Sequence, residues 1–185
     1  MEKEKLKIIG ITGSFCSGKD TIADYLVSKG WPNFSLSDEI REVLKKENIE
    51  PTRDNLIKKG NDLRQEFGNQ VLAERTFKKI KENSIITSVR NLGEIEFLKN
   101  KANFCLIFVD APIWERYSRA KNRGKETDKV TFEQFRNQEQ QEKSKEKNKQ
   151  QLDLCKDRAD FIIINDGNLE DLYKKVEGII GKINE

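Results

Sequence analysis

The chain has 185 residues, a length that fits one domain with a sizeable core. Its 35 basic and 32 acidic residues give a net charge of +3, and 36% of all residues are charged. The sequence contains no histidine, which excludes Ser-His and Cys-His nucleophile pairs, His-ligated zinc and imidazole acid–base catalysis.

The three cysteines, Cys16, Cys105 and Cys155, lie far apart and form no CxxC motif. This pattern fits neither a disulfide framework nor a zinc site, and it favours a reducing cytoplasm. The N-terminal apolar run is too short for a signal peptide, and no window approaches the roughly 18 apolar residues of a membrane span. The small, mixed net charge argues against nucleic acid as a partner.

Short apolar runs alternate along the chain with longer amphipathic stretches. The apolar runs cover residues 6–11, 34–36, 84–89, 104–109 and 161–164. Helical patterns cover residues 21–29, 38–46, 53–67, 70–81, 93–98, 113–121, 132–156 and 169–183. All runs except the second are continuously apolar or β-branched, which predicts strands buried on both faces of a parallel sheet. The alternation predicts a three-layer α/β fold in a single domain.

Residues 136–151 include no apolar side chain. We interpret them as part of a solvent-exposed helix stabilised by i,i+4 pairs such as Glu139–Lys143. A mobile basic flap over a ligand is the alternative interpretation.

The strongest motif is GSFCSGKDT, which fits the G-x-x-x-x-G-K phosphate loop and lies between the first predicted strand and a helix. The glycines let successive backbone N–H groups point inward at a helix N-terminus and bind anions. Lys19, a predicted catalytic residue, would reach the β- and γ-phosphates of ATP. The predicted ATP-binding residues of this loop are Gly13, Ser14, Cys16, Ser17, Gly18, Lys19, Asp20 and Thr21.

The magnesium site is predicted from a departure in this motif. Asp20 follows the lysine where Ser or Thr usually holds Mg²⁺, and Thr21 comes next. The end of the third predicted strand, which often supplies a second acid, reads ITSVR and contains none. We therefore expect Asp20, together with Thr21, to hold Mg²⁺.

Several segments carry a resemblance to known kinases. The GKD-T pattern of the loop is similar to that of phage deoxynucleoside monophosphate kinases, and the segment VDAPIWERYSRAKNRG…ADFIIINDGNLEDLYKKV is similar to dephospho-CoA kinases. The segments SLSDEIRE, TRDNLIKKGNDLR and SVRNLGEIEFL resemble an archaeal group of uncharacterised kinase-like proteins. Over nearly its whole length the chain thus resembles the P-loop nucleotide kinase superfamily. The resemblance implies a five-stranded parallel sheet flanked by helices, an acceptor-binding helical flap at residues 37–82 and a lid at residues 116–150.

The acceptor site is predicted from one acid and three arginines. Asp38 and Arg41 lie at i,i+3 on one helical face, although Asp38 could instead be a helix N-cap. By resemblance, Arg41 would bind an acceptor phosphate, and Asp38 would hydrogen-bond or deprotonate an acceptor hydroxyl. Arg90 directly follows the third strand, where parallel sheets bind ligands, so we expect it to bind the acceptor or the transferred phosphoryl group. Arg64 is a second candidate, with an exposed helix arginine as the alternative.

Arg116, Arg119 and Arg123 fall on one helical face, where like charges repel unless an anion lies between them. The resemblance places these residues in the lid and implies catalytic roles for Arg119 and Arg123 over the transferred phosphoryl group. It also places Asn165 and Gly167, after the fifth strand, beside the adenine of ATP.

Together these features predict an ATP- and Mg²⁺-dependent kinase that phosphorylates a small nucleotide-type acceptor, first of all a (deoxy)nucleoside monophosphate. A dephospho-CoA kinase acting on a ribose hydroxyl is one alternative, and an ATP-binding regulatory module without turnover is another. A monophosphate acceptor needs no general base, whereas a hydroxyl acceptor would need the carboxylate of Asp38. The oligomeric state and the choice between ATP and GTP stay open.

Overall fold

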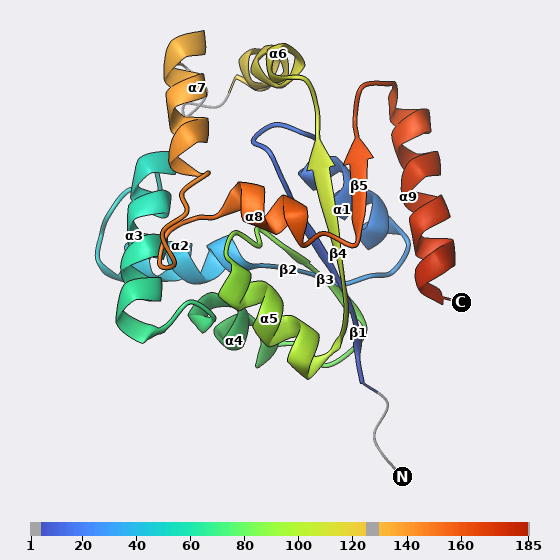
Figure 1. Ribbon diagram of the computed structural model, residues 1–185, viewed down its shortest axis with the longest axis horizontal. Coiled ribbons are helices and arrows are strands. Elements are labelled where there is room, and N and C mark those ends of the chain that lie inside the picture. The colour runs from blue at the N-terminus through green and yellow to red at the C-terminus, as the bar shows by residue number, and fades with distance from the viewer. Residues whose placement is uncertain (1–4, 125–129, 185) are drawn as a thin grey trace.

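The computed structural model describes residues 5–124 and 130–184 (Figure 1). It contains a five-stranded parallel sheet in the order β2-β3-β1-β4-β5, which confirms the predicted three-layer α/β fold. The strands are β1 (Lys7–Gly13), β2 (Asn33–Ser35), β3 (Ser84–Thr87), β4 (Asn103–Asp110) and β5 (Phe161–Ile164). The helices are α1 (Lys19–Ser28), α2 (Leu36–Lys46), α3 (Arg53–Phe67), α4 (Val71–Phe77), α5 (Leu92–Lys101), α6 (Ile113–Arg123), α7 (Phe132–Gln141), α8 (Leu152–Asp157) and α9 (Leu169–Asn184).

The sheet is buried on both faces by separate groups of helices. On one face, Ile8 of β1 packs in a cluster with side chains of α2, α4, α5 and α8. On the other face, the next residue, Ile9, packs with side chains of α1 and α9. Because successive residues of a strand point to opposite faces, the continuous apolar sequence of β1 supplies both clusters. Figure 1 shows α9 beside β5 at one end of the molecule and α2 and α3 at the other.

The prediction that the fifth strand is buried on both faces is wrong. β5 lies at the edge of the sheet, and Ile162 and Ile164 are 51% and 43% exposed, whereas Ile163 is buried. A run of four apolar residues cannot reveal whether a strand lies at the centre or the edge of a sheet, because that depends on strand order.

The prediction of one exposed helix through residues 136–151 is also wrong. Helix α7 ends at Gln141, an antiparallel bridge joins Lys143 to Gln151, and α8 then begins. The Glu139–Lys143 ion pair does form, at 2.9 Å, but Glu139 and Glu142 are both buried. Arginines from other helices supply their partners, which the local sequence does not show. The helix predicted at residues 70–81 is shorter as well and ends at Phe77.

None of Cys16, Cys105 and Cys155 is part of a disulfide bond in the described structure. Among the helices of residues 5–124 and 130–184, none has the length and apolar character that a membrane crossing requires.

Candidate active site

The phosphate loop connects β1 to α1 in a backbone conformation that needs glycine. Gly13, Cys16 and Gly18 have φ values of 143°, 58° and 100°. A β-carbon at Gly13 would lie 1.9 Å from the carbonyl oxygen of Val109. The first glycine of the motif is therefore required both by its backbone angle and by its contact with the neighbouring strand. The resulting curl brings the N-terminus of α1 to the carboxyl edge of the sheet.

Lys19 is buried at the start of α1, where its Nζ donates a hydrogen bond of 3.0 Å to the carbonyl oxygen of Ser14. Burial, assisted by the charge of Arg90, lowers the pKa of Lys19 to about 8. The hydroxyl of Ser17 is buried without a hydrogen-bond partner among the described residues. A buried cation and an unpaired hydroxyl are donors that an anionic ligand would satisfy.

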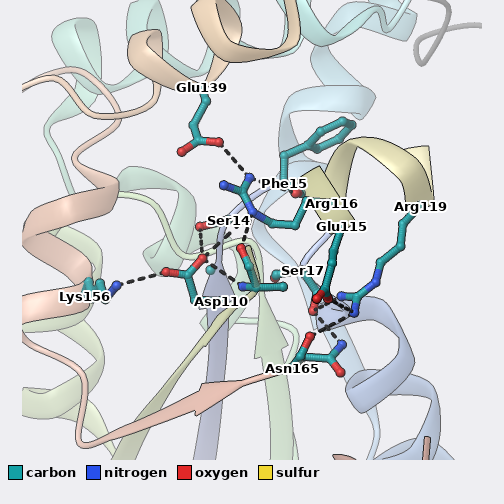
Figure 2. A network of polar contacts seen from close by, with 12 residues as sticks. Ser14, Phe15, Ser17, Asp110, Glu115, Arg116, Arg119, Glu139, Lys156 and Asn165 are labelled. Carbon is teal, nitrogen blue, oxygen red and sulfur yellow. Dashed lines mark hydrogen bonds and ion pairs between the residues drawn. The ribbon is translucent and has the colours of Figure 1, made fainter. Parts of the chain in front are cut away.

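Asp110, at the end of β4, holds the beginning of the loop (Figure 2). Its carboxylate accepts hydrogen bonds from Ser14 Oγ at 2.8 Å and from Lys156 Nζ at 2.9 Å. Burial acts to raise the pKa of Asp110, but the bonds from Lys156 and Ser14 outweigh it and keep the pKa below the usual value. Asp110 is thus ionised at neutral pH and anchors the loop to β4.

Arg116 supports the middle of the loop and is not part of an open lid face. It is 4% exposed, and its Nη1 donates to Glu139 Oε2 at 2.7 Å and to the carbonyl of Phe15 at 3.3 Å. The prediction that Arg116 faces an anionic partner together with Arg119 and Arg123 is therefore wrong. Its charge is neutralised inside the protein by Glu139 of α7 (Figure 2).

Arg119 and Asn165 support the end of the loop. Nδ2 of Asn165 donates to the carbonyl of Ser17 at 2.8 Å, and Nη2 of Arg119 donates to the carbonyl of Asn165 at 2.8 Å (Figure 2). A β-carbon at Gly18 would lie 2.4 Å from Asn165 Nδ2, so a glycine there lets this amide approach the loop. The adenine contact expected of Asn165 stays a prediction, while its contact with the loop is clear.

A cavity of about 720 Å³ opens in front of the loop, a size typical of small-molecule sites. It is lined by most of the residues predicted from the sequence, namely Cys16, Gly18, Lys19, Asp20, Thr21, Asp38, Arg41, Arg64, Arg90, Arg119 and Arg123. Within the described part of the chain, the predicted residues outside its lining are Gly13, Ser14, Ser17, Asn165 and Gly167. The fold thus gathers side chains from the loop, α2, α3, β3 and α6 around one space.

Arg90, Arg53 and Glu142 form a charged cluster on the wall of this cavity. Nη1 of Arg90 donates to the carbonyl of Gly13 at 2.9 Å and lies 3.7 Å from Glu142 Oε2. Nε and Nη2 of Arg53 donate to Glu142 Oε1 at 3.1 and 2.7 Å. Burial acts to raise the pKa of Glu142, but the charges of Arg90 and Arg53 outweigh it and lower the pKa.

Sequence reasoning missed Arg53, Glu142 and Phe15, which all line the cavity. The guanidinium of Arg53 lies 3.8 Å from the centroid of the Phe15 ring, so α3 packs directly on the phosphate loop. Arg53 and Glu142 belong to charge-rich helical segments, where no local pattern separates a buried charge from an exposed one. Because Arg53 and Glu142 are 89 positions apart, the sequence gives no sign that they form a pair.

The remaining predicted acceptor residues differ in their environment. Arg64 is not an exposed helix arginine, because it is 2% exposed and pairs with Glu94. Asp38 is not an N-cap, since α2 begins at Leu36. Asp38 and Arg41 both line the cavity, as their i,i+3 spacing predicted.

Asp20 is exposed and Thr21 is partly buried, and both line the cavity. No group of three or more Asp, Glu or Cys side chains that could hold a metal ion is found in residues 5–124 and 130–184. The carboxylate of Asp20 and the hydroxyl of Thr21 are oxygen ligands of the kind that Mg²⁺ takes when bound phosphates and water supply its other ligands.

A family profile described as an AAA domain matches residues 9–146. The chain is 31% identical to a UPF0200 protein of Thermococcus gammatolerans over 95% of both chains. It is 28% identical to a UPF0200/UPF0201 protein of Archaeoglobus fulgidus, of which it spans only 56%.

Solved structures share the fold at low identity. The crystal structure of TT1252 from Thermus thermophilus has a TM-score of 0.62 and 21% identity, covering 97% of this chain and 98% of that one. Shikimate kinase from Acinetobacter baumannii, in complex with shikimate, has a TM-score of 0.57 and 19% identity, covering 97% and 95%. With the phosphate loop and the parallel sheet, these matches show that the chain belongs to the AAA-domain family and to the UPF0200 proteins, and that its fold is that of the P-loop kinases.

Proposed function

We propose that this protein is an ATP- and Mg²⁺-dependent phosphotransferase that moves the γ-phosphoryl group of ATP to a small nucleotide-type acceptor. One observation carries the proposal. The buried Lys19 of the phosphate loop and the arginines Arg41, Arg53 and Arg90 of other elements line the same cavity of about 720 Å³. ATP alone would not require cationic side chains from several separate elements around one space.

ATP would lie on the phosphate loop, with its phosphates at the N-terminus of α1 and beside Lys19. Asp20 and Thr21 would hold Mg²⁺, which neutralises phosphate charge and orients the transferred group. Asn165 and Gly167 would border the adenine. Ser17 supports the assignment of the loop, because its buried, unpaired hydroxyl is a donor without an acceptor among the described residues.

The acceptor would bind in the same cavity, beside Asp38, Arg41, Arg64 and Arg90. Arginines bind phosphate oxygens in pairs and stay charged, which favours an acceptor with a phosphate group. A (deoxy)nucleoside monophosphate is the first such acceptor, and dephospho-CoA is the second. The fold neighbours include shikimate kinases and a sugar kinase, which supports a small-molecule acceptor.

Residues 37–82 would form the acceptor flap and residues 116–150 the lid, of which residues 125–129 lie outside the described part of the chain. Arg119 and Arg123 line the cavity from α6 and would contact the transferred phosphoryl group. Closing these segments over both substrates would exclude water, and the substrates would then react in a fixed orientation. Three cysteines without a disulfide bond between them fit a cytoplasmic enzyme.

The test is an ADP-release assay with Mg·ATP over a panel of ribo- and deoxynucleoside monophosphates and dephospho-CoA. We expect release only when an acceptor is present, and loss of at least 100-fold in Lys19→Met. ATP binding with no acceptor-dependent release anywhere in the panel would favour the regulatory ATP-binding module. The absence of an acid at Thr87 and Ser88 is the observation on which that alternative rests.

A further inference from the structure

Resting on the proposed kinase function, we infer that the reacting atom of the acceptor is a hydroxyl oxygen, and that Glu142 binds this hydroxyl. The acceptor is then a sugar or nucleoside that carries both an anionic group and a free hydroxyl. Its phosphate would bind to the protein but would not itself be phosphorylated. The phosphate loop and the arginines are compatible with either a hydroxyl or a phosphate as the reacting group of the acceptor. The buried carboxylate of Glu142 distinguishes between the two.

Glu142 is 3% exposed, and its two carboxylate oxygens have different surroundings. Oε1 accepts both hydrogen bonds from Arg53. Oε2 is buried and has no hydrogen-bond partner among the described residues, and the nearest cation, Nη1 of Arg90, lies 3.7 Å away. That distance is too long for a hydrogen bond, and a buried acceptor without a donor is unfavourable. Since Glu142 lines the cavity, a ligand can supply the donor.

The position of Oε2 places this donor near the phosphate loop. Arg90, its nearest cation, also donates to the carbonyl of Gly13. Glu142 and Lys19 are close enough for each charge to shift the pKa of the other. The group that meets Glu142 is therefore the part of the acceptor that approaches the γ-phosphate, rather than a remote part of the molecule.

A phosphate and a hydroxyl would interact differently with Oε2 of Glu142. Arg90 and Arg53 keep Glu142 ionised, so it can only accept hydrogen bonds. An ionised phosphate offers no proton and would add a further negative charge beside a buried carboxylate. A hydroxyl donates to Oε2 and adds no charge.

A second observation points the same way. The side-chain oxygen of Gln150 is also buried on the cavity wall without a partner in the described part of the chain. Two unpaired acceptors indicate a ligand rich in O–H or N–H groups, as sugars and nucleosides are. The anionic group of the acceptor is left to Arg41, an exposed residue of α2 that lines the cavity.

In the transfer step, the acceptor oxygen forms a bond to the γ-phosphorus while the bond from that phosphorus to the bridging oxygen of ADP breaks. ADP leaves with the electron pair of the broken bond, and the hydroxyl proton passes to Oε2 of Glu142. A carboxylate with a lowered pKa is a weak base, which suits a loose transition state in which the proton leaves late.

The first experiment identifies the bond that is made. The protein is incubated with Mg·ATP and, separately, with ribonucleoside 5′-monophosphates, dephospho-CoA and shikimate, and the products are identified by ³¹P NMR. A nucleoside monophosphate carries a phosphate and two hydroxyls, so one probe can give either product. We expect phosphate monoesters. Nucleoside diphosphates as the only products would overturn this inference and leave the proposed function intact, whereas no transfer to any probe would overturn both.

The second experiment tests Glu142 directly. With the best hydroxyl probe, Glu142→Gln is expected to lower kcat at least 100-fold and to change the Kd of Mg·ATP by less than twofold. Glu146→Gln, an exposed carboxylate in the same segment, is the matched control and should keep both values. Tighter ATP binding with an unchanged kcat would show instead that Glu142 is only a counter-ion competing with phosphate.

A variant of Glu142 that keeps the negative charge distinguishes a loss of catalysis from a loss of folding. Glu142→Asp retains the carboxylate but withdraws it by one methylene from the cavity. We expect its thermal unfolding to stay close to that of the wild type and its kcat to fall at least tenfold. An unchanged kcat in Glu142→Asp would overturn the role of this carboxylate even if Glu142→Gln failed to fold.

Discussion

Nε and Nη2 of Arg64 both donate hydrogen bonds to Oε1 of Glu94, at 3.0 and 2.8 Å, and neither side chain is more than 1% exposed. The other oxygen of Glu94 accepts bonds from the backbone N–H groups of Arg90 and Asn91, at 2.7 and 3.0 Å. One carboxylate therefore joins α3 to the segment that follows β3. This arrangement sets the position of Arg90 from within the protein core.

We predict that Arg64→Ala lowers the free energy of unfolding by about 3–5 kcal/mol, because it leaves the charge of Glu94 buried without its partner. Urea denaturation measures this change. Lys58→Ala, an exposed residue of the same helix, is the control and should stay within about 0.5 kcal/mol of the wild type. A loss in Arg64→Ala no larger than in the control would show that the ion pair contributes little.

The lowered pKa of Lys19 predicts a pH dependence of ATP binding. Because the ammonium group loses its proton as the pH rises through about 8, the Kd of Mg·ATP should increase by about tenfold per pH unit above that value. Binding titrations between pH 7 and 9.5 test this expectation. Lys19→Met should bind weakly without any pH-dependent step, and an equal step in this variant would assign the titration to another group.

The lowered pKa of Lys19 also predicts that its contribution to the free energy of unfolding rises at alkaline pH. The pKa of Lys19 is about 8 in the folded protein, compared with its ordinary value of 10.5. Between these values the unfolded chain binds more protons than the folded one, so the contribution of Lys19 to the free energy of unfolding increases with pH. Urea denaturation at pH 7.5 and 9.5 measures the free energy of unfolding at each pH. Between these two values, this free energy should increase more, or decrease less, in the wild type than in Lys19→Met. An identical change in both proteins would contradict the lowered pKa.

The proposed magnesium ligand gives a further prediction. Asp20→Ala should raise the Mg²⁺ concentration for half-maximal activity at least tenfold, since it removes the acidic ligand that follows the phosphate-loop lysine. A Mg²⁺ titration of the ADP-release assay measures the shift. Asp24→Ala, one turn further along α1, is the matched control, and full Mg²⁺-dependent activity in Asp20→Ala would refute the assignment.

The acceptor side of the cavity is tested at Arg41. A hydrogen bond to a charged group contributes about 1.5–3 kcal/mol, so Arg41→Ala should raise the KM of the acceptor by about 10- to 100-fold. The kcat should change far less, because Arg41 holds a group distant from the reacting atom. Lys45→Ala, a basic residue on the next turn of α2, is the control. A selective loss of ATP binding in Arg41→Ala would move this residue to the nucleotide side.

Much of the fold and part of the site follow from local patterns. The loop from Gly13 to Thr21 was predictable because the anion site is made within one strand–loop–helix unit. The i,i+3 spacing of Asp38 and Arg41 likewise predicted that both line one cavity. The position of Arg90 after a buried strand was sufficient to place it at the carboxyl edge of the sheet.

The partners of charged side chains could not be predicted in this way. Arg64, Arg116 and Glu142 belong to charge-rich helical patterns of the sequence, yet all three are buried. Each is neutralised by a residue on another helix, more than 20 positions away along the chain. Helical periodicity tells which side of a helix a residue occupies, but it does not tell what packs there.

The sequence by itself determined an α/β fold with a phosphate-loop motif after its first strand, and it excluded any site built on histidine. Only the tertiary structure decided which charges face the cavity and which support the loop from behind. The physical reason is that a backbone motif is fixed by neighbours in the chain, whereas a buried charge is stable only beside an opposite charge. In this protein those opposite charges come from distant segments, so the abundant charged residues acquire distinct roles only when the chain is folded.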